Sequence, residues 1–301
     1  MTGGSERNAG AAGAAGAVPS ADLVADLEHG LRETRQTSIA ALLTGTALIR
    51  VAAAGATVAV QFYLADLAHG HPHGTTIGLV GTAQAISEMV FAPFLARFAD
   101  RLGRKLFVVG GPVVGAIGLL LVAASLHSQQ IFAARILEGL AAAAFVPTAL
   151  GAIAAATSLS VRARARASGA FEAATMAGYA GGFVLGPFAY HYLGRGAFVV
   201  LAVVYLLAGI VCLRFVAHVP PLPVTRLSTL LRDVAGPGPI RSFLPAWVGT
   251  FAIVGAYGSN LAALLHHSPV RGQRLVHHFD TRLVSVVLVS AVAILVIGIV
   301  L

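Results

Sequence analysis

The sequence predicts an all-α integral membrane protein with about eight membrane-spanning helices. Hydrophobic residues make up 57% of the 301 residues, charged residues only 11%, and the mean hydropathy is +0.84. An ordinary soluble domain has about 25% charged residues, so this chain lacks the charge needed to cover a water-exposed surface. The apolar residues form continuous runs, which favours helices over the alternating strands of a membrane barrel.

The segment 1–38 is expected to be a cytoplasmic tail. Its first 19 residues are rich in Gly, Ala and Ser, which is typical of a disordered segment rather than a signal peptide. Leu23, Leu27 and Leu31 then recur at four-residue spacing with charged residues between them. This pattern indicates a short amphipathic helix over 20–36 that lies on the membrane surface.

Eight apolar segments follow, each near the roughly 20 residues that cross a bilayer as a helix. The first six form a predicted N-terminal bundle over 39–217. A stretch rich in Pro and Arg over 218–242 is expected to be a cytoplasmic linker, and 243–301 supplies two helices of an incomplete second bundle. The predicted segments are 39–65, 77–96, 107–126, 131–156, 168–190, 196–217, 243–265 and 283–301.

The basic residues predict the orientation of these helices. Ten of them lie in the loops after the second, fourth and sixth segments, whereas the alternate loops are poor in Lys and Arg, apart from three arginines in 266–282. Cytoplasmic loops carry an excess of basic residues, so we expect a multi-pass plasma-membrane protein with a cytoplasmic N-terminus. The net charge of +8 is thereby explained without a nucleic-acid partner.

The most specific motif is A-R-F-A-D-R-L-G-R-K, which runs from Ala96 to Lys105. Its single acid, Asp100, lies among four cations and could hold two helix ends together, and Gly103 permits a tight turn. Taken alone, the motif could also be a basic loop that only fixes topology.

This string resembles the loop between the second and third helices of the major facilitator superfamily, G-x-L-A-D-R-x-G-R-K. Ala96 and Phe98 differ from that pattern. The resemblance implies a helical bundle of the major-facilitator type, a secondary transport activity, and a gating role for the loop as a latch between two halves. The matching residues are Asp100, Arg101, Gly103, Arg104 and Lys105.

A second match lies in the fourth segment, where Arg135 and Glu138 stand in R-I-L-E-G. Residues three apart share a helix face, and charges inside a membrane normally face a cavity or a partner. The family pattern is R-x-x-Q-G, with the arginine associated with proton coupling, and the resemblance implies that role for Arg135. A self-neutralising pair near the outer interface is the alternative, and the Glu138 that replaces Gln permits either.

The fifth segment contains Gly178, Gly182 and Gly186 at four-residue spacing, followed by Pro187. Small residues at this spacing let helices approach closely, and proline can kink a helix. The segment resembles the G-x-x-x-G-P signature of family members that exchange an exported substrate for protons. Ordinary packing of small residues is the alternative.

Two further charges, Arg50 and Glu88, are expected near mid-membrane. Each lies about 12 residues, or roughly 18 Å, inside its segment. Because a lone charge at this depth is costly, we expect the two to pair across adjacent helices, with Gln61 and Gln84 as further polar neighbours. Glu88 is our predicted protonation site and Arg50 its modulator, with a static structural ion pair as the alternative.

No metal site, cofactor or enzymatic chemistry is predicted. The histidines of H-G-H-P-H-G and of 266–282 could bind zinc or copper, but Gly and Pro interrupt them, so solvated loop histidines are expected instead. No phosphate-binding loop is present in the sequence, which argues against ATP-driven transport by this chain. A membrane enzyme that uses Glu88 is conceivable.

Together, these features predict a secondary transporter that works by alternating access and exports a small, partly apolar molecule with proton coupling. Its expected partners are the substrate, protons and the lipid bilayer. The residues expected to border the central site are Arg50, Glu88, Arg135 and Glu138.

The family usually has twelve helices, and eight are counted in this sequence. The chain could therefore be a fragment, a shortened inactive product or a subunit completed by another chain or copy. We expect that the 301 residues alone do not transport. A non-transporting regulatory or scaffold protein is the alternative function.

Overall fold

The computed structural model describes residues 21–69 and 74–217, two isolated residues at 245 and 290, and side chains from residue 33 onward. Within these residues the chain is helical apart from short connections, and no strand is present, which confirms the predicted all-α class. The predicted linker over 218–242 lies outside the described ranges, and so do the last two predicted segments apart from residues 245 and 290. The helices are α1 (Ala21–Leu67), α2 (Gly74–Leu102), α3 (Arg104–Ala124), α4 (Ser128–Ala156), α5 (Val161–Leu193) and α6 (Gly196–Phe215).

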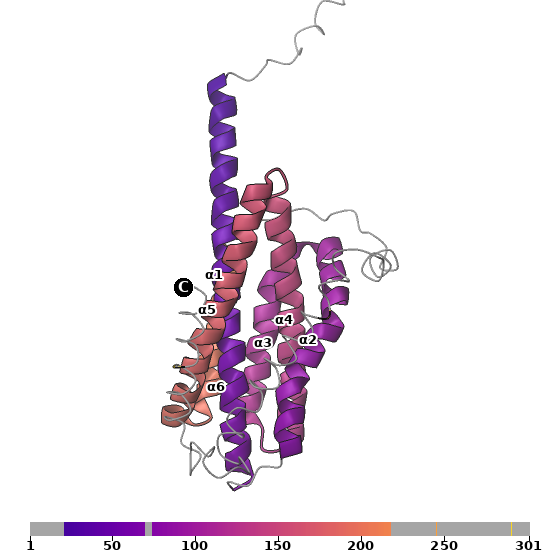
Figure 1. Ribbon diagram of the computed structural model, residues 1–301, viewed down its shortest axis with the longest axis vertical. Helices are drawn as coiled ribbons and strands as arrows, with labels where there is room; N and C mark the ends of the chain where they lie inside the picture. Colours follow the sequence, from indigo (N-terminus) through magenta and orange to yellow (C-terminus); the bar gives the residue numbers. More distant parts are fainter. Residues whose placement is uncertain (1–20, 70–73, 218–244, 246–289, 291–301) are drawn as a thin grey trace, which may run out of the picture.

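The helices form an upright bundle, and the N-terminal part of α1 projects beyond it (Figure 1). α1 packs mainly against α5 and α6, and α4 packs mainly against α2 and α3. Contacts of α3 with α6 and of α1 with α4 join these two groups. Small side chains such as Ala56, Ala142 and Ala208 are fully enclosed, because helices in lipid associate through close packing of small residues.

Five of the six described helices are long and apolar enough to cross a membrane: α2, α3, α4, α6 and the Glu33–Leu67 part of α1. Their outward faces carry large apolar side chains, such as Leu206, Ile210 and Leu213 of α6, which suit contact with lipid tails. α5, which the sequence predicts to span, does not reach the same hydropathy. Its first turns carry three arginines and its interior is rich in Gly and Ala, yet it packs along α1 inside the bundle.

The N-terminal region differs from the sequence-based prediction. α1 is one continuous helix of 47 residues, so no break near residue 38 separates a surface helix from the first span. The hydropathy changes there, but neither Pro nor Gly occurs between residues 31 and 44, and nothing local stops the helix. At 1.5 Å per residue, α1 is about 70 Å long, which exceeds the roughly 30 Å of a bilayer core.

The two basic connections are also shorter than predicted. α2 continues to Leu102 and α3 begins at Arg104, so the predicted loop from Ala96 is helical except at Gly103. Gly103 has φ 100°, a conformation that glycine adopts without strain. Likewise, α5 begins at Val161, where the Ser160 hydroxyl accepts a hydrogen bond from the Ala163 amide at 3.2 Å. The arginines of that predicted loop therefore lie on the first turns of α5.

Candidate functional site

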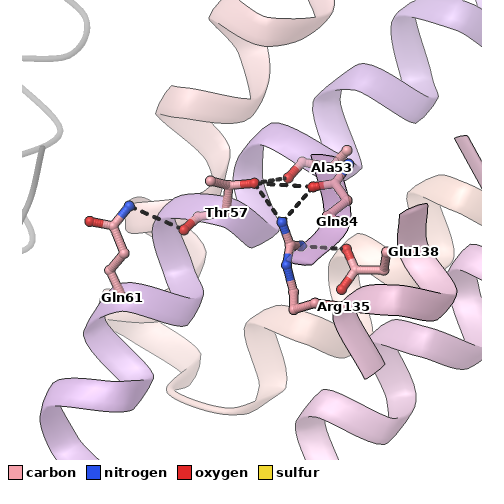
Figure 2. A network of polar contacts seen from close by, with 6 residues as sticks. All are labelled: Ala53, Thr57, Gln61, Gln84, Arg135 and Glu138. Atoms are coloured by element: carbon pink, nitrogen blue, oxygen red, sulfur yellow. Dashed lines mark hydrogen bonds and ion pairs between the residues drawn. The ribbon is translucent and has the colours of Figure 1, made fainter. Parts of the chain in front are cut away.

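A polar network occupies the centre of the bundle, where α1, α2 and α4 meet (Figure 2). Its hub is Arg135 of α4, whose Nη1 donates to Glu138 Oε2 at 2.6 Å. Nη2 of the same guanidinium donates to Thr57 Oγ1 of α1 at 2.8 Å and to Gln84 Oε1 of α2. Both Arg135 and Glu138 have side chains with 0% exposure. The pair neutralises itself, and it also joins three helices.

Close packing of α2 on α4 places Gln84 within reach of Arg135. A Cβ at Gly139 of α4 would overlap the backbone oxygen of Gln84 and lie 2.5 Å from Cβ of Ser87. Glycine at this position therefore permits the approach. The Ser87 hydroxyl donates to the Ile136 carbonyl at 2.8 Å, which fixes the two helices at the same level.

A second ion pair joins α1 to α2. Arg50 Nη2 lies 3.1 Å from Glu88 Oε1, and the two side chains are 10% and 23% exposed. This observation confirms the pairing predicted from their depths. The guanidinium carbon also lies 5.4 Å from the ring centroid of Tyr179 on α5, a cation–π distance. Arg50 is thus held between an acid and an aromatic ring from different helices.

Both ion pairs have contacts with α1 and α2. On α1, Thr57 lies two turns beyond Arg50, and on α2, Gln84 lies one turn before Glu88. Thr57 and Gln84 also approach each other, with 3.4 Å between Thr57 Oγ1 and Gln84 Oε1. A movement between α1 and α2 would therefore affect both pairs.

The glycine motif of α5 lies against α1. A Cβ at Gly178 would be 2.5 Å from Cβ of Arg50, and one at Gly182 would be 2.5 Å from the Val51 carbonyl oxygen. A Cβ at Gly186 would overlap the α1 backbone. These positions need glycine because the two helix backbones touch, and the contact at Gly178 helps to place Arg50. Pro187 follows, buried within the same helix.

The basic motif forms a tether at one end of the bundle. Arg104 Nε and Nη2 both lie 2.9 Å from Asp100 Oδ1, and Nη1 donates to the Gly151 carbonyl of α4 at 2.7 Å. The tether joins the end of α2, the start of α3 and the last turns of α4. Arg101 is exposed and Lys105 is half-buried. The predicted contact of this loop with a second half falls on residues outside the described ranges.

The opposite end of the bundle is tied by a network that the sequence analysis missed. Tyr63 of α1 donates its hydroxyl hydrogen to the Ser125 carbonyl, which also accepts a bond from Arg195 Nη2 at 2.8 Å. The guanidinium of Arg195 lies 5.0 Å from the Tyr63 ring centroid. Tyr190 of α5 donates to Asp66 of α1 at 2.5 Å. These bonds connect α1 to α5 and to the α3–α4 connection.

Three further residues of the bundle interior were also missed: Thr57, Tyr179 and Tyr205, the last of which lies on α6 with 0% exposure. Thr57 had a usable signal, because it is a polar residue seven positions after Arg50 and hence on nearly the same helix face. The two tyrosines lie among small or apolar residues, and nothing in their spacing marks them. Over 33–69 and 74–217, no three His, Cys, Asp or Glu side chains are grouped as metal ligands would be.

Comparison with known proteins agrees with this architecture. Residues 42–301 match the family described as the Major Facilitator Superfamily, which confirms the resemblance seen in the sequence. A bacterial homologue of the human lysosomal transporter Spinster, in an inward-facing and occupied conformation, superposes with a TM-score of 0.61 at 17% identity. The superposition covers 85% of this chain and 58% of that one, and it supports the fold.

The curated relatives carry resistance names. Multidrug resistance protein 2 of Bacillus subtilis is 33% identical over 121 residues, which is 38% of this chain and 30% of that protein. Multidrug resistance protein 1 of the same organism is 30% identical over 140 residues, or 46% and 36%. Quinolone resistance protein NorA of Staphylococcus aureus is 30% identical over 81 residues, or 27% and 21%. The chain matches about a third of the length of the first two.

Proposed function

Because the chain belongs to the Major Facilitator Superfamily, we propose that it acts in proton-coupled efflux of a small, partly apolar molecule by alternating access. The observation that carries this proposal is the ion pair of Arg50 and Glu88, which joins α1 to α2 and leaves 10% and 23% of the two side chains exposed. The resistance proteins among its relatives support export as the direction of transport.

Glu88 is the proposed proton-accepting group. Its side chain is 23% exposed, and in the proposed mechanism the exposed part of the carboxylate takes up the proton. Protonation forms an O–H bond on Glu88 and neutralises the partner of Arg50. The contact between α1 and α2 then loses its ionic character, while Tyr179 still holds the guanidinium from α5. Proton binding thus acts on the packing of α1 against α2.

The tethered end is proposed to face the cytoplasm of a cell with this protein in its plasma membrane. The basic residues concentrate at that end, as in the cytoplasmic loops of membrane proteins. There the contacts of Arg104 with Asp100 and Gly151 hold three helix ends as one unit. Such a unit can serve as one side of an inward gate, with Arg101 and Lys105 available to a second half.

The alternative is a non-transporting membrane protein, for example a regulatory or scaffold subunit. The Arg135 guanidinium favours this alternative. It is fully enclosed and bonded to three side chains, as expected of a static structural element. The two functions differ at Glu88, because a scaffold has no need for an acid that water can reach.

Everted vesicles from membranes of the cells that make the protein provide the test, since any partner chain is then present. We expect a pH gradient to drive accumulation of ethidium, and Glu88→Gln to abolish it. Glu172→Gln is the matched control, because Glu172 is an exposed acid on α5. Transport that ignores the pH gradient or survives Glu88→Gln would contradict proton coupling at this residue. Absence of transport at equal protein levels would favour the scaffold.

A further inference from the structure

α6 is about as long as the hydrocarbon core of a bilayer is thick. Its 20 residues extend about 30 Å at 1.5 Å per residue, and the core measures about 30 Å. An upright α6 therefore has both ends at the level of the lipid headgroups. An arginine stands at each end, because Arg195 precedes the first turn and Arg214 lies in the last.

The two arginines have different surroundings. Arg195 Nη2 donates to the Ser125 carbonyl at 2.8 Å, and its guanidinium lies against the Tyr63 ring. Arg214 is exposed, and no hydrogen bond or ion pair joins it to another residue of 33–69 or 74–217. One end of α6 thus has its cation held inside the protein, whereas the other end presents its cation to the surroundings.

Arg214 continues an exposed apolar stripe of α6. Leu207, Ile210 and Arg214 follow at spacings of three and four residues and so share a helix face. Leu207 is 48% exposed and Ile210 58%, at a depth where the surroundings are acyl chains. A long cationic side chain at the end of such a stripe can extend its charge into the headgroup layer. The face therefore offers apolar surface to a chain and a cation to a phosphate.

A second cation lies beside the same end of α6. The Ser38 hydroxyl of α1 donates to the Phe215 carbonyl at 3.3 Å and accepts from the Ala217 amide at 3.0 Å, which places the two helix ends side by side. Arg35 is half-buried and stands three residues before Ser38, on the same face of α1. Glu33 is two positions from Arg35 and does not share its face, and α6 contains no acid.

We propose that this end of α6 is a binding site for an anionic phospholipid. Arg214 and Arg35 bind the headgroup phosphate, and Leu207 and Ile210 contact an acyl chain. Charge-assisted hydrogen bonds from guanidinium groups to phosphate are among the strong ones in proteins. The site faces outward from the bundle, and it depends neither on the proposed proton coupling nor on transport.

The start of α5, at the same end of the bundle, shows why charge alone does not make such a site. Its first turns carry three exposed arginines. The exposed residues that follow them along α5 include Ser168, Gly169 and Glu172, which form no apolar stripe. An anion of any kind can approach those arginines, whereas the end of α6 combines cations with apolar surface at membrane depth. A phospholipid has both matching parts, and free phosphate has only one.

Native mass spectrometry of the full chain in detergent micelles tests the site, with phosphatidylglycerol and phosphatidylcholine of identical chains added in equal amounts. We expect the protein to retain phosphatidylglycerol preferentially. Arg35→Gln/Arg214→Gln should weaken that binding roughly twentyfold, because each basic residue near a membrane surface contributes about fivefold. Arg162→Gln/Arg166→Gln is the matched control. It removes the same charge from the same end of the bundle and should leave the binding within about twofold.

Three outcomes would overturn the proposal. The wild type could retain the two lipids equally, or the two double variants could lose phosphatidylglycerol to the same extent, as general electrostatic attraction requires. Ile210→Ser could leave the affinity for phosphatidylglycerol unchanged, which would indicate a phosphate site without an acyl chain. If the double variant does not fold, Arg214→Gln alone changes an exposed side chain and should still weaken the binding about fivefold.

Discussion

The two arginine–glutamate pairs of the bundle solve the same electrostatic problem in different ways. Arg50 and Glu88 come from different helices and keep 10% and 23% of their side chains exposed. Arg135 and Glu138 come from one helix and have 0% exposure. Burying a charge costs several kcal/mol unless neighbours replace its hydration, and only the enclosed arginine has additional bonds to Thr57 and Gln84.

The comparison teaches that exposure rather than residue type separates the roles of the two acids. An acid that water reaches can exchange protons freely, whereas an enclosed acid can hold a proton or act as a structural element. The difference comes from the neighbours. Gly118 of α3 lets Glu138 of α4 pack closely against it, whereas Glu88 lies on α2 next to Met89, which is 72% exposed.

The largest effect is expected from removal of the enclosed acid. Glu138→Ala leaves the fully enclosed Arg135 without its ionic partner, which should lower the free energy of unfolding by about 3–5 kcal/mol. Glu88→Ala should cost less, because Arg50 keeps 10% of its side chain exposed and the Tyr179 ring still contacts its guanidinium. Unfolding in detergent micelles, followed by circular dichroism, measures both values. Equal losses would show that the two pairs do not differ in solvation.

An intermediate effect is expected from Gly178→Val, which acts on the contact between α5 and α1 beside Arg50. The new side chain meets Cβ of Arg50, and such overpacking typically costs about 1–3 kcal/mol. Gly169→Val provides the control on the same helix, because a Cβ at Gly169 meets nothing within 4 Å. The thermal midpoint in micelles should fall for the first variant and not for the second. A similar fall for both would attribute the effect to helix propensity.

The smallest effect is expected at the third ion pair, between Asp100 and Arg104. The Asp100 side chain is 39% exposed, so Asp100→Asn should change the free energy of unfolding by about 0.5 kcal/mol or less. Arg104→Ala should cost more, because it also removes the bond to the Gly151 carbonyl. If the two variants had the same stability in the unfolding experiment, the bond to Gly151 would contribute nothing.

Much of the described fold could be predicted from the sequence. Hydropathy located six helices between residues 39 and 217, because apolar runs of this length have few alternatives in a membrane. It failed at the helix ends. α1 extends back to Ala21 and α5 back to Val161. A helix continues through charged residues that no longer lie in lipid, whereas hydropathy reports only the change of environment.

The site was predicted in part. The depths of Arg50 and Glu88 and the three-residue spacing of Arg135 and Glu138 are properties of single helices, and both pairs are present in the structure. Tyr205 could not be found in this way. It lies in a uniformly apolar helix, and its ring packs against Gly115 of another helix. That contact depends on how the helices cross.

The contrast between an open and a sealed pair is tested most directly at two neighbouring positions of α2. Ser87 is 5% exposed and bonds to α4, while the side chain of Glu88 pairs with Arg50 and is 23% exposed. Single cysteines at these positions, in a Cys212→Ala background that removes the only native cysteine, should differ in reaction with a water-soluble maleimide. We predict labelling of Glu88→Cys in membranes and none of Ser87→Cys. Equal labelling of both, or of neither, would contradict the division into an open and a sealed site.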